Sequence, residues 1–112
     1  MIGKVNIEGG TTDIKMHEKN IGHISSNGRI RVNFTVGKNA KYIVLEAIYI
    51  SNWKTRLFLF VGENYNSLYP RDDTVITFKD ISYDPKTGEI VCDLLLVGSW
   101  VVDNLVARAY SI

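Results

Sequence analysis

The strongest constraint on the fold is a strict alternation of apolar and polar residues in the stretch GRIRVNFTVG, residues 28–37. Successive side chains of a β-strand point to opposite faces, so a period of two places each set on its own face. The apolar set is Ile30, Val32, Phe34 and Val36. We therefore expect a strand with one face on a core and the other in water, as is usual in antiparallel sheets.

Turn residues divide the rest of the chain into similar short segments rich in Val, Ile, Phe, Tyr and Thr. Such spacing is typical of an all-β sandwich or barrel. The predicted strands are 4–7, 12–16, 22–25, 29–36, 41–50, 56–62, 74–79, 89–97 and 104–112. A single helical turn at 15–20, ended by Gly22, is the alternative for that segment. We predict an all-β, antiparallel, two-sheet β-sandwich of about eight or nine strands.

Two turns are marked most clearly. The sequence DPKTG at 84–88 offers a turn initiator, the fixed φ of proline and a glycine for positive φ, so we expect a hairpin there. The sequence SNGR at 26–29 predicts a second tight turn. Asn27 and Gly28 both tolerate positive φ, which favours type I′ geometry.

Length and charge bound the class of protein. A chain of 112 residues, 46% hydrophobic, is expected to form one domain, 1–112, with a core of its own. The net charge is +1 and no block of like charge occurs. Nucleic-acid binding needs a concentrated basic surface, so we expect none.

The compartment is inferred from cysteine use and from apolar runs. Cys92 is the single cysteine, so no internal disulfide can form, which fits a cytoplasm or a particle assembled inside a cell. The opening MIGKVNIEGG lacks the pattern of a signal peptide. No uncharged apolar run approaches the length of a transmembrane helix, and we expect no membrane insertion.

Several later strands are apolar on both faces, unlike residues 28–37. A lone two-layer sandwich covers only one face of each sheet, so large side chains would remain in water. Those expected to be wet are Tyr49, Phe58, Phe60, Leu95 and Val97. Such a patch is near the limit that monomers tolerate. We therefore predict a homo-oligomer packed sheet against sheet; the alternative is a lid formed by the first 28 residues.

Catalytic and metal motifs are weak. His17 and His23 flank Glu18, but their spacing matches neither a helical zinc pair nor a zinc finger. Adjacent carboxylates such as Asp72 and Asp73 point to opposite faces of a strand, whereas a glycosidase needs two that face each other. No phosphate loop or nucleophile elbow occurs. We expect no enzyme, no cofactor and no metal, and Cys92 as a small buried hydrophobe.

Aromatic residues in loops form the one suggestive set. Trp53 lies in ISNWKTR, and two tyrosines lie in GENYNSLYPRDD, a long loop for a small domain. Rings flanked by amides and charges can stack on a sugar and bind its hydroxyls; the alternative is that they anchor the loop or a subunit contact. The candidate ligand-binding residues are Trp53, Tyr65, Tyr69, Arg71 and Asp72.

Four features together resemble a known family: the opening NIEGGTTDI, the alternating strands between turns, the hairpin YDPKTGEI, and the apolar last strand NLVARAYSI. They are similar to the small β-sandwich domains at the ends of bacteriophage tail fibres and baseplate receptor-binding proteins. The resemblance implies a jelly-roll-like homotrimer in the virion that attaches to host saccharide or protein. It assigns no role to any single residue.

Three functions remain open at this point. The first is a non-enzymatic, homo-oligomeric tail module that binds a cell-surface glycan. The second is a purely structural virion or assembly protein without a ligand. The third is a small carbohydrate-active or ligand-binding β domain that uses the region of Asp72.

Overall fold

The computed structural model describes residues 3–7, 10–50, 53–61, 76–99 and 101–112. Within these ranges the strands are β1 (Gly3–Ile7), β2 (Gly10–Ile24), β3 (Arg29–Thr35), β4 (Tyr42–Ile50), β5 (Trp53–Phe60), β6 (Ile76–Asp84), β7 (Glu89–Leu96) and β8 (Val102–Ser111). No helix in this part of the chain has the length and apolar character to cross a membrane.

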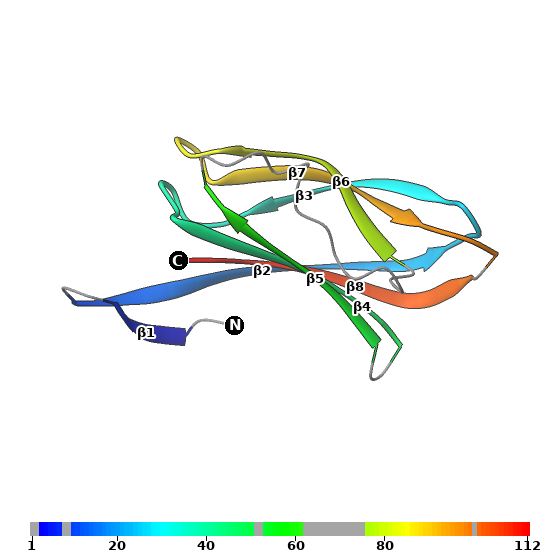
Figure 1. Cartoon of the computed structure of the whole chain (residues 1–112), viewed down its shortest axis with the longest axis horizontal. Helices are drawn as coiled ribbons and strands as arrows, with labels where there is room; N and C mark the ends of the chain where they lie inside the picture. Colours follow the sequence, from blue (N-terminus) through cyan, green and yellow to red (C-terminus); the bar gives the residue numbers. More distant parts are fainter. Residues whose placement is uncertain (1–2, 8–9, 51–52, 62–75, 100) are drawn as a thin grey trace.

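The body of the molecule is a sandwich of two antiparallel sheets (Figure 1). The large sheet has the order β2-β8-β4-β5, and the small sheet has the order β3-β7-β6. β1 continues the large sheet beyond β2, but it pairs only with residues 10–14 of β2, whereas β8 pairs with residues 15–24. The β1–β2 hairpin therefore extends past the seven-stranded body. The predicted two-sheet antiparallel sandwich is confirmed.

The core lies between the inner faces of the two sheets. Val32 and Phe34 of β3 are buried and their polar neighbours are exposed, so the alternation in residues 28–37 has the predicted outcome. The small sheet adds Ile90 and Leu94, and the large sheet adds residues such as Leu45. Burying each large apolar side chain contributes about 1.5–3 kcal/mol, which explains why most of the buried inner positions are apolar.

The N-terminal part of the chain differs from the prediction. Residues 12–16 and 22–25, predicted as two strands, belong to the single strand β2, and the segment 15–20 is strand, not helix. The pairing of β2 with β8 shifts register around Gly22, whose φ is +81°. A bulge at this glycine lets one strand bend and continue its ladder. Because β2 is part of the sheet, it cannot act as a lid, and that alternative is wrong.

The hairpin predicted at residues 84–88 is confirmed. Asp84 pairs with Glu89 across β6 and β7, and the amide of Gly88 donates to the carbonyl of Asp84 at 2.8 Å. Gly88 has a φ of +80°. β6 is longer than predicted, because a register shift between Lys79 and Ser82 absorbs an irregularity and the strand continues.

The turn at Asn27 and Gly28 forms, but it is not type I′. The amide of Gly28 donates to the carbonyl of Ser25 at 2.8 Å, and Asn27 has a φ of 56°, whereas Gly28 is not among the positive-φ glycines. β2 and β3 lie in different sheets, so the turn carries the chain between layers instead of closing a two-residue hairpin.

The large side chains predicted to be exposed to water differ in their actual exposure. Phe58 is 62% exposed and Val97 54% exposed, as predicted, and Leu95 is half-buried. Tyr49 is buried at 8% exposure, because it continues the inward alternation of Leu45 and its neighbours, so that prediction is wrong. The side chain of Phe60 lies outside the described residues.

Candidate functional site

The predicted glycan-binding residues fall almost entirely outside the described residues. Tyr65, Tyr69, Arg71 and Asp72 lie there, as does the side chain of Trp53. The backbone of Trp53 opens β5 and is opposite Ile50 of β4. These five assignments therefore stay predictions.

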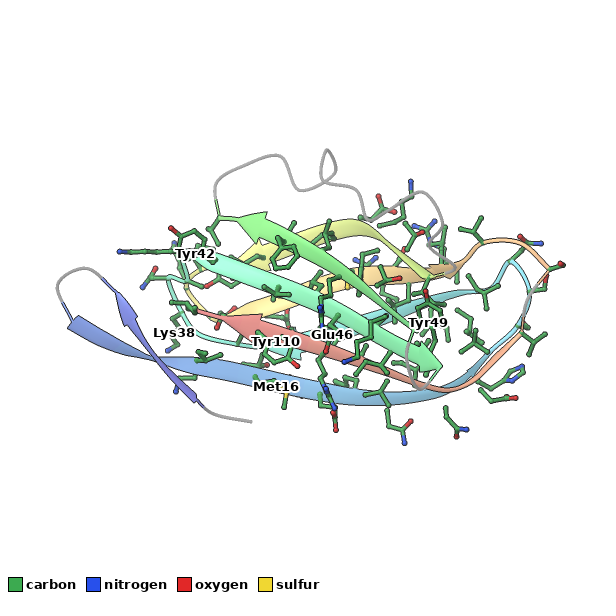
Figure 2. All side chains as sticks on the ribbon, turned by 60° about the horizontal axis from the view of Figure 1, so that its bottom comes forward. Met16, Lys38, Tyr42, Glu46, Tyr49 and Tyr110 are labelled. Atoms are coloured by element: carbon green, nitrogen blue, oxygen red, sulfur yellow. The ribbon has the colours of Figure 1, made fainter. Side chains whose placement is uncertain are left out.

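The outer face of the large sheet carries the most organised set of side chains. The outer face is the side of β2, β8, β4 and β5 that points away from the small sheet. No described strand lies over it, and in Figure 2 it is turned forward, with Met16, Tyr110 and Glu46 on three of its strands. The pairing registers align the side chains of all four strands in rows across the sheet.

One row is a ladder of alternating charge, here called the charge row. In order across the sheet it consists of Glu18, Arg108, Glu46 and Arg56. Nε of Arg108 donates to Oε1 of Glu18 at 2.6 Å, and Nε of Arg56 donates to Oε2 of Glu46 at 2.7 Å. Nη1 of Arg108 lies 3.6 Å from Oε1 of Glu46. The row is thus a continuous chain of ion pairs across the large sheet.

Glu46 is the centre of this row and is only 5% exposed, although it points away from the core. The hydroxyl of Tyr110 donates to its Oε1 at 3.2 Å, in addition to the contacts with Arg56 and Arg108. Burial alone would raise the pKa of Glu46, but the hydrogen bond and charge of Arg56 outweigh it, so the pKa is lowered. Hydrogen bonds to Glu18 and Tyr110 raise the pKa of Arg108. Glu46 and Arg108 are therefore both charged at neutral pH.

The rows on either side of the charge row are less polar. One, here called the apolar row, consists of Met16, Tyr110, Val44 and Phe58. Phe58 is 62% exposed, and Tyr42, two residues before Val44 on the same face of β4, is 45% exposed. The row on the other side consists of Asn20, Val106, Ile48 and Lys54. The outer face therefore combines exposed aromatic rings with a fixed pattern of charge.

The small sheet has a comparable buried carboxylate on its own outward side. Asp93 is 5% exposed, and its oxygens accept hydrogen bonds from Nε of Arg29 at 2.6 Å and from Nη1 of Arg31 at 3.2 Å. Arg29 also pairs with Asp80, and the bond to Asp93 is the main reason that the pKa of Arg29 is raised. Leu95, opposite Arg29, is half-buried, so this surface has less exposed apolar area than the outer face.

A cleft of about 530 Å³ opens at one edge of the sandwich, where β2 approaches the end of β3. Its lining includes Lys15, Met16, Thr35, Gly37, Lys38 and Thr87. Lys15 and Lys38 are exposed, and neither makes an ion pair with another described residue. The wall of the cleft is mainly apolar, and two lysines and two threonines are among its lining residues.

The two histidines do not come together. Nδ1 of His17 accepts a hydrogen bond from the amide of Thr35 at 2.7 Å, and its ring packs edge-on against Phe34. At the surface, Nδ1 of His23 lies 2.7 Å from Oδ1 of Asp103. Across the described ranges, no group of three or more His, Cys, Asp or Glu side chains is arranged to hold a metal ion.

Cys92 is fully buried in β7, which confirms its prediction as a small core residue. Burial is the main reason that its thiol pKa rises to about 12, and the charge of Asp93 adds to the effect. A thiol with such a pKa is not a nucleophile at neutral pH.

The sequence prediction did not single out Glu46 or Asp93. Each is a lone carboxylate inside an otherwise apolar strand, in YIVLEAIYI and VCDLLLV respectively. A charge at such a position is costly unless it is paired, so it predicts arginine on a neighbouring strand. That signal was present, but the identity of the neighbouring strands was needed to use it.

Comparison of the chain with protein-family models, with curated proteins and with solved structures found no match.

Proposed function

We propose that this chain is a non-enzymatic β-sandwich module that associates with copies of itself through the outer face of its large sheet. The observation that carries the proposal is the exposure of Phe58, 62%, beside a charge row that is already fully paired. An exposed aromatic ring on a sheet face that no described strand covers is the kind of surface that protein interfaces bury.

The setting we propose is a bacteriophage or prophage tail, where the module would be a receptor-binding or structural part of the virion. Two observations support this setting: the resemblance of the sequence to phage tail-fibre and baseplate domains, and the order in which the strands pair. The first strand of the body, β2, pairs with the last, β8, and the second, β3, pairs with the second last, β7. This order favours a jelly-roll-like wrapping. The resemblance by itself implies a trimer, whereas the charge pattern of the outer face, described below, favours a pair of copies.

Sedimentation velocity of paired variants tests self-association. Phe58→Asp places a charge on the outer face, whereas Val97→Asp places one on a similarly exposed side chain after the small-sheet strand β7. We expect the wild type and Val97→Asp to sediment as oligomers and Phe58→Asp to sediment as a single folded chain. An unchanged mass for a folded Phe58→Asp protein would overturn the role of this face.

Receptor binding is a separate part of the proposal and has its own test. We expect the wild type to bind surface saccharides on a glycan array, and the double variant Trp53→Ala/Tyr69→Ala to lose that binding while keeping its circular dichroism spectrum. If the wild type binds no glycan and still oligomerises, the purely structural virion role is the better account.

A second candidate, binding of a small acidic ligand, is favoured by the edge cleft. Lys15 and Lys38 would bind a carboxylate, and the hydroxyls of Thr35 and Thr87 would bind sugar hydroxyls. Titration with a hexuronic acid, followed by NMR, should shift amide signals around Gly37. The double variant Lys15→Ala/Lys38→Ala should abolish the shifts; shifts that persist in it would contradict this candidate.

A further inference from the structure

The outer face is self-complementary in charge, and we infer that it binds a second copy of the chain face to face around a two-fold axis. The axis runs roughly parallel to the strands, between β8 and β4. This inference rests on the proposed self-association and adds to it the orientation and the register of the pair.

The order of charges in the charge row carries the inference. Across the sheet the signs run negative, positive, negative, positive from β2 to β5. A two-fold axis along the strands places each row opposite the same row of the second copy, with the strand order reversed, so that β2 faces β5 and β8 faces β4. Glu18 then faces Arg56 of the second copy, and Arg108 faces the second copy's Glu46. Every charge meets its opposite.

The two neighbouring rows agree with the same axis. In the apolar row, Met16 faces Phe58 of the second copy, which is a favourable sulfur–aromatic pair. In the row on the other side, Val106 faces the second copy's Ile48, and Asn20 faces its Lys54. No position puts a charge against an apolar side chain.

The alternative axis, perpendicular to the strands, fails on the same pattern. It would place each member of the charge row against its own copy, so that Glu46 faces Glu46 and Arg56 faces Arg56. Like charges at this separation repel in a water-poor interface. The charge row therefore selects one orientation, while the aromatic rings supply most of the attraction.

The area of the outer face limits how strongly two copies of the chain can bind each other. Four strands about 4.8 Å apart, with about seven residues each at about 3.4 Å, cover roughly 450 Å² per copy. Two such faces bury about 900 Å², less than the roughly 1,000 Å² that a stable specific interface exceeds and in the range of weak, transient pairs. We therefore expect dissociation in the micromolar range.

Chemical cross-linking tests the orientation directly. Asn20 and Lys54 are both exposed and, with three strand spacings between them in one chain, lie about 14 Å apart. In the two-fold pair each faces the other across the interface. We expect a short bis-maleimide to join Asn20→Cys chains to Lys54→Cys chains in a mixture, and to join neither variant to itself. Buried Cys92 serves as the unreactive internal control.

Each cross-linking outcome has one meaning. In an oligomeric protein, joining of either variant to itself, or no joining in the mixture, would overturn the two-fold orientation and leave self-association standing. A mass of three chains in solution would also overturn the two-fold orientation and leave self-association standing. A wild type that is monomeric at all concentrations would overturn the self-association on which the inference rests.

A charge pair at position 20 gives a second, independent readout. Because each residue 20 faces Lys54 of the other copy, Asn20→Glu should tighten the dimer about fivefold and Asn20→Lys should weaken it about fivefold, summed over the two equivalent contacts. The two variants lie too far from Lys54 of their own chain for a close ion pair. Equal dissociation constants for both would contradict the inference.

Discussion

Glu46 and Arg56 face each other on neighbouring strands, 2.7 Å apart, and the carboxylate is nearly buried on a side of the sheet that no described strand covers. A carboxylate leaves water at a cost, and that cost is offset here by two arginines and a tyrosine hydroxyl. The ion pairs of the charge row therefore hold its side chains in fixed positions in the single chain, without a bound partner. Such pre-organisation lowers the entropy that binding must overcome.

Replacing Glu46 should change how stability depends on pH. Its lowered pKa means that its contribution is complete above its ordinary pKa near 4.5 and is lost as the pH falls through the lowered value. We expect Glu46→Gln to cost about 2 kcal/mol at pH 7 and much less at pH 3. Urea unfolding at the two pH values measures both. A cost that is the same at both would contradict the role of this carboxylate.

Gly88 should be far less replaceable than Gly22, although both have a φ near +80°. A Cβ at Gly88 would lie 2.2 Å from the carbonyl oxygen of Val36, whereas a Cβ at Gly22 meets nothing within 4 Å. Gly22→Ala should cost about 1–2 kcal/mol from backbone strain alone, and Gly88→Ala about 3 kcal/mol or more. Thermal unfolding compares the two. Equal losses would show that the clash relaxes without cost.

The hydroxyl of Tyr83 ties β6 to the connection between β3 and β4. It donates to the carbonyl of Gly37 at 2.6 Å and accepts from the amide of Ala40 at 3.0 Å. Tyr83→Phe should cost about 1–3 kcal/mol, because it leaves two backbone groups without this partner. Denaturant unfolding gives the value, and faster amide exchange at Ala40 should accompany it. An unchanged free energy of unfolding, together with unchanged amide exchange at Ala40, would contradict this role of the Tyr83 hydroxyl.

Cys92 should resist thiol reagents in the native protein. It is fully buried and its pKa is about 12, so neither access nor thiolate is present at pH 8. We expect labelling with a maleimide only as fast as the chain unfolds, and complete labelling in denaturant. Rapid labelling of the folded protein would contradict the packing of β7 and remove the internal control of the cross-linking experiment.

Much of the fold was predictable from local pattern. The alternation around Val32 and Phe34, and the turn residues at 84–88, each follow from the chemistry of single strands and turns. Tyr49 was mispredicted as wet because two apolar faces look alike in a strand until the covered one is known. The length of β2 depends on its pairing with β8, some ninety residues away, which no local pattern specifies.

The candidate site was the less predictable part. The charge row exists only because β2, β8, β4 and β5 are neighbours, and three of these four come from distant parts of the chain. Glu46 could have been noted as a lone carboxylate in an apolar strand. Its partner Arg108 could not have been chosen from the sequence, since only the sheet order places it opposite.

Sedimentation equilibrium of the wild-type chain over a range of concentrations shows whether two copies pair through the outer face. We expect the weight-average mass to rise from one to two times the 12.7 kDa of a single chain as the concentration passes through the micromolar range. A mass that stays at one chain up to the highest concentrations would contradict it.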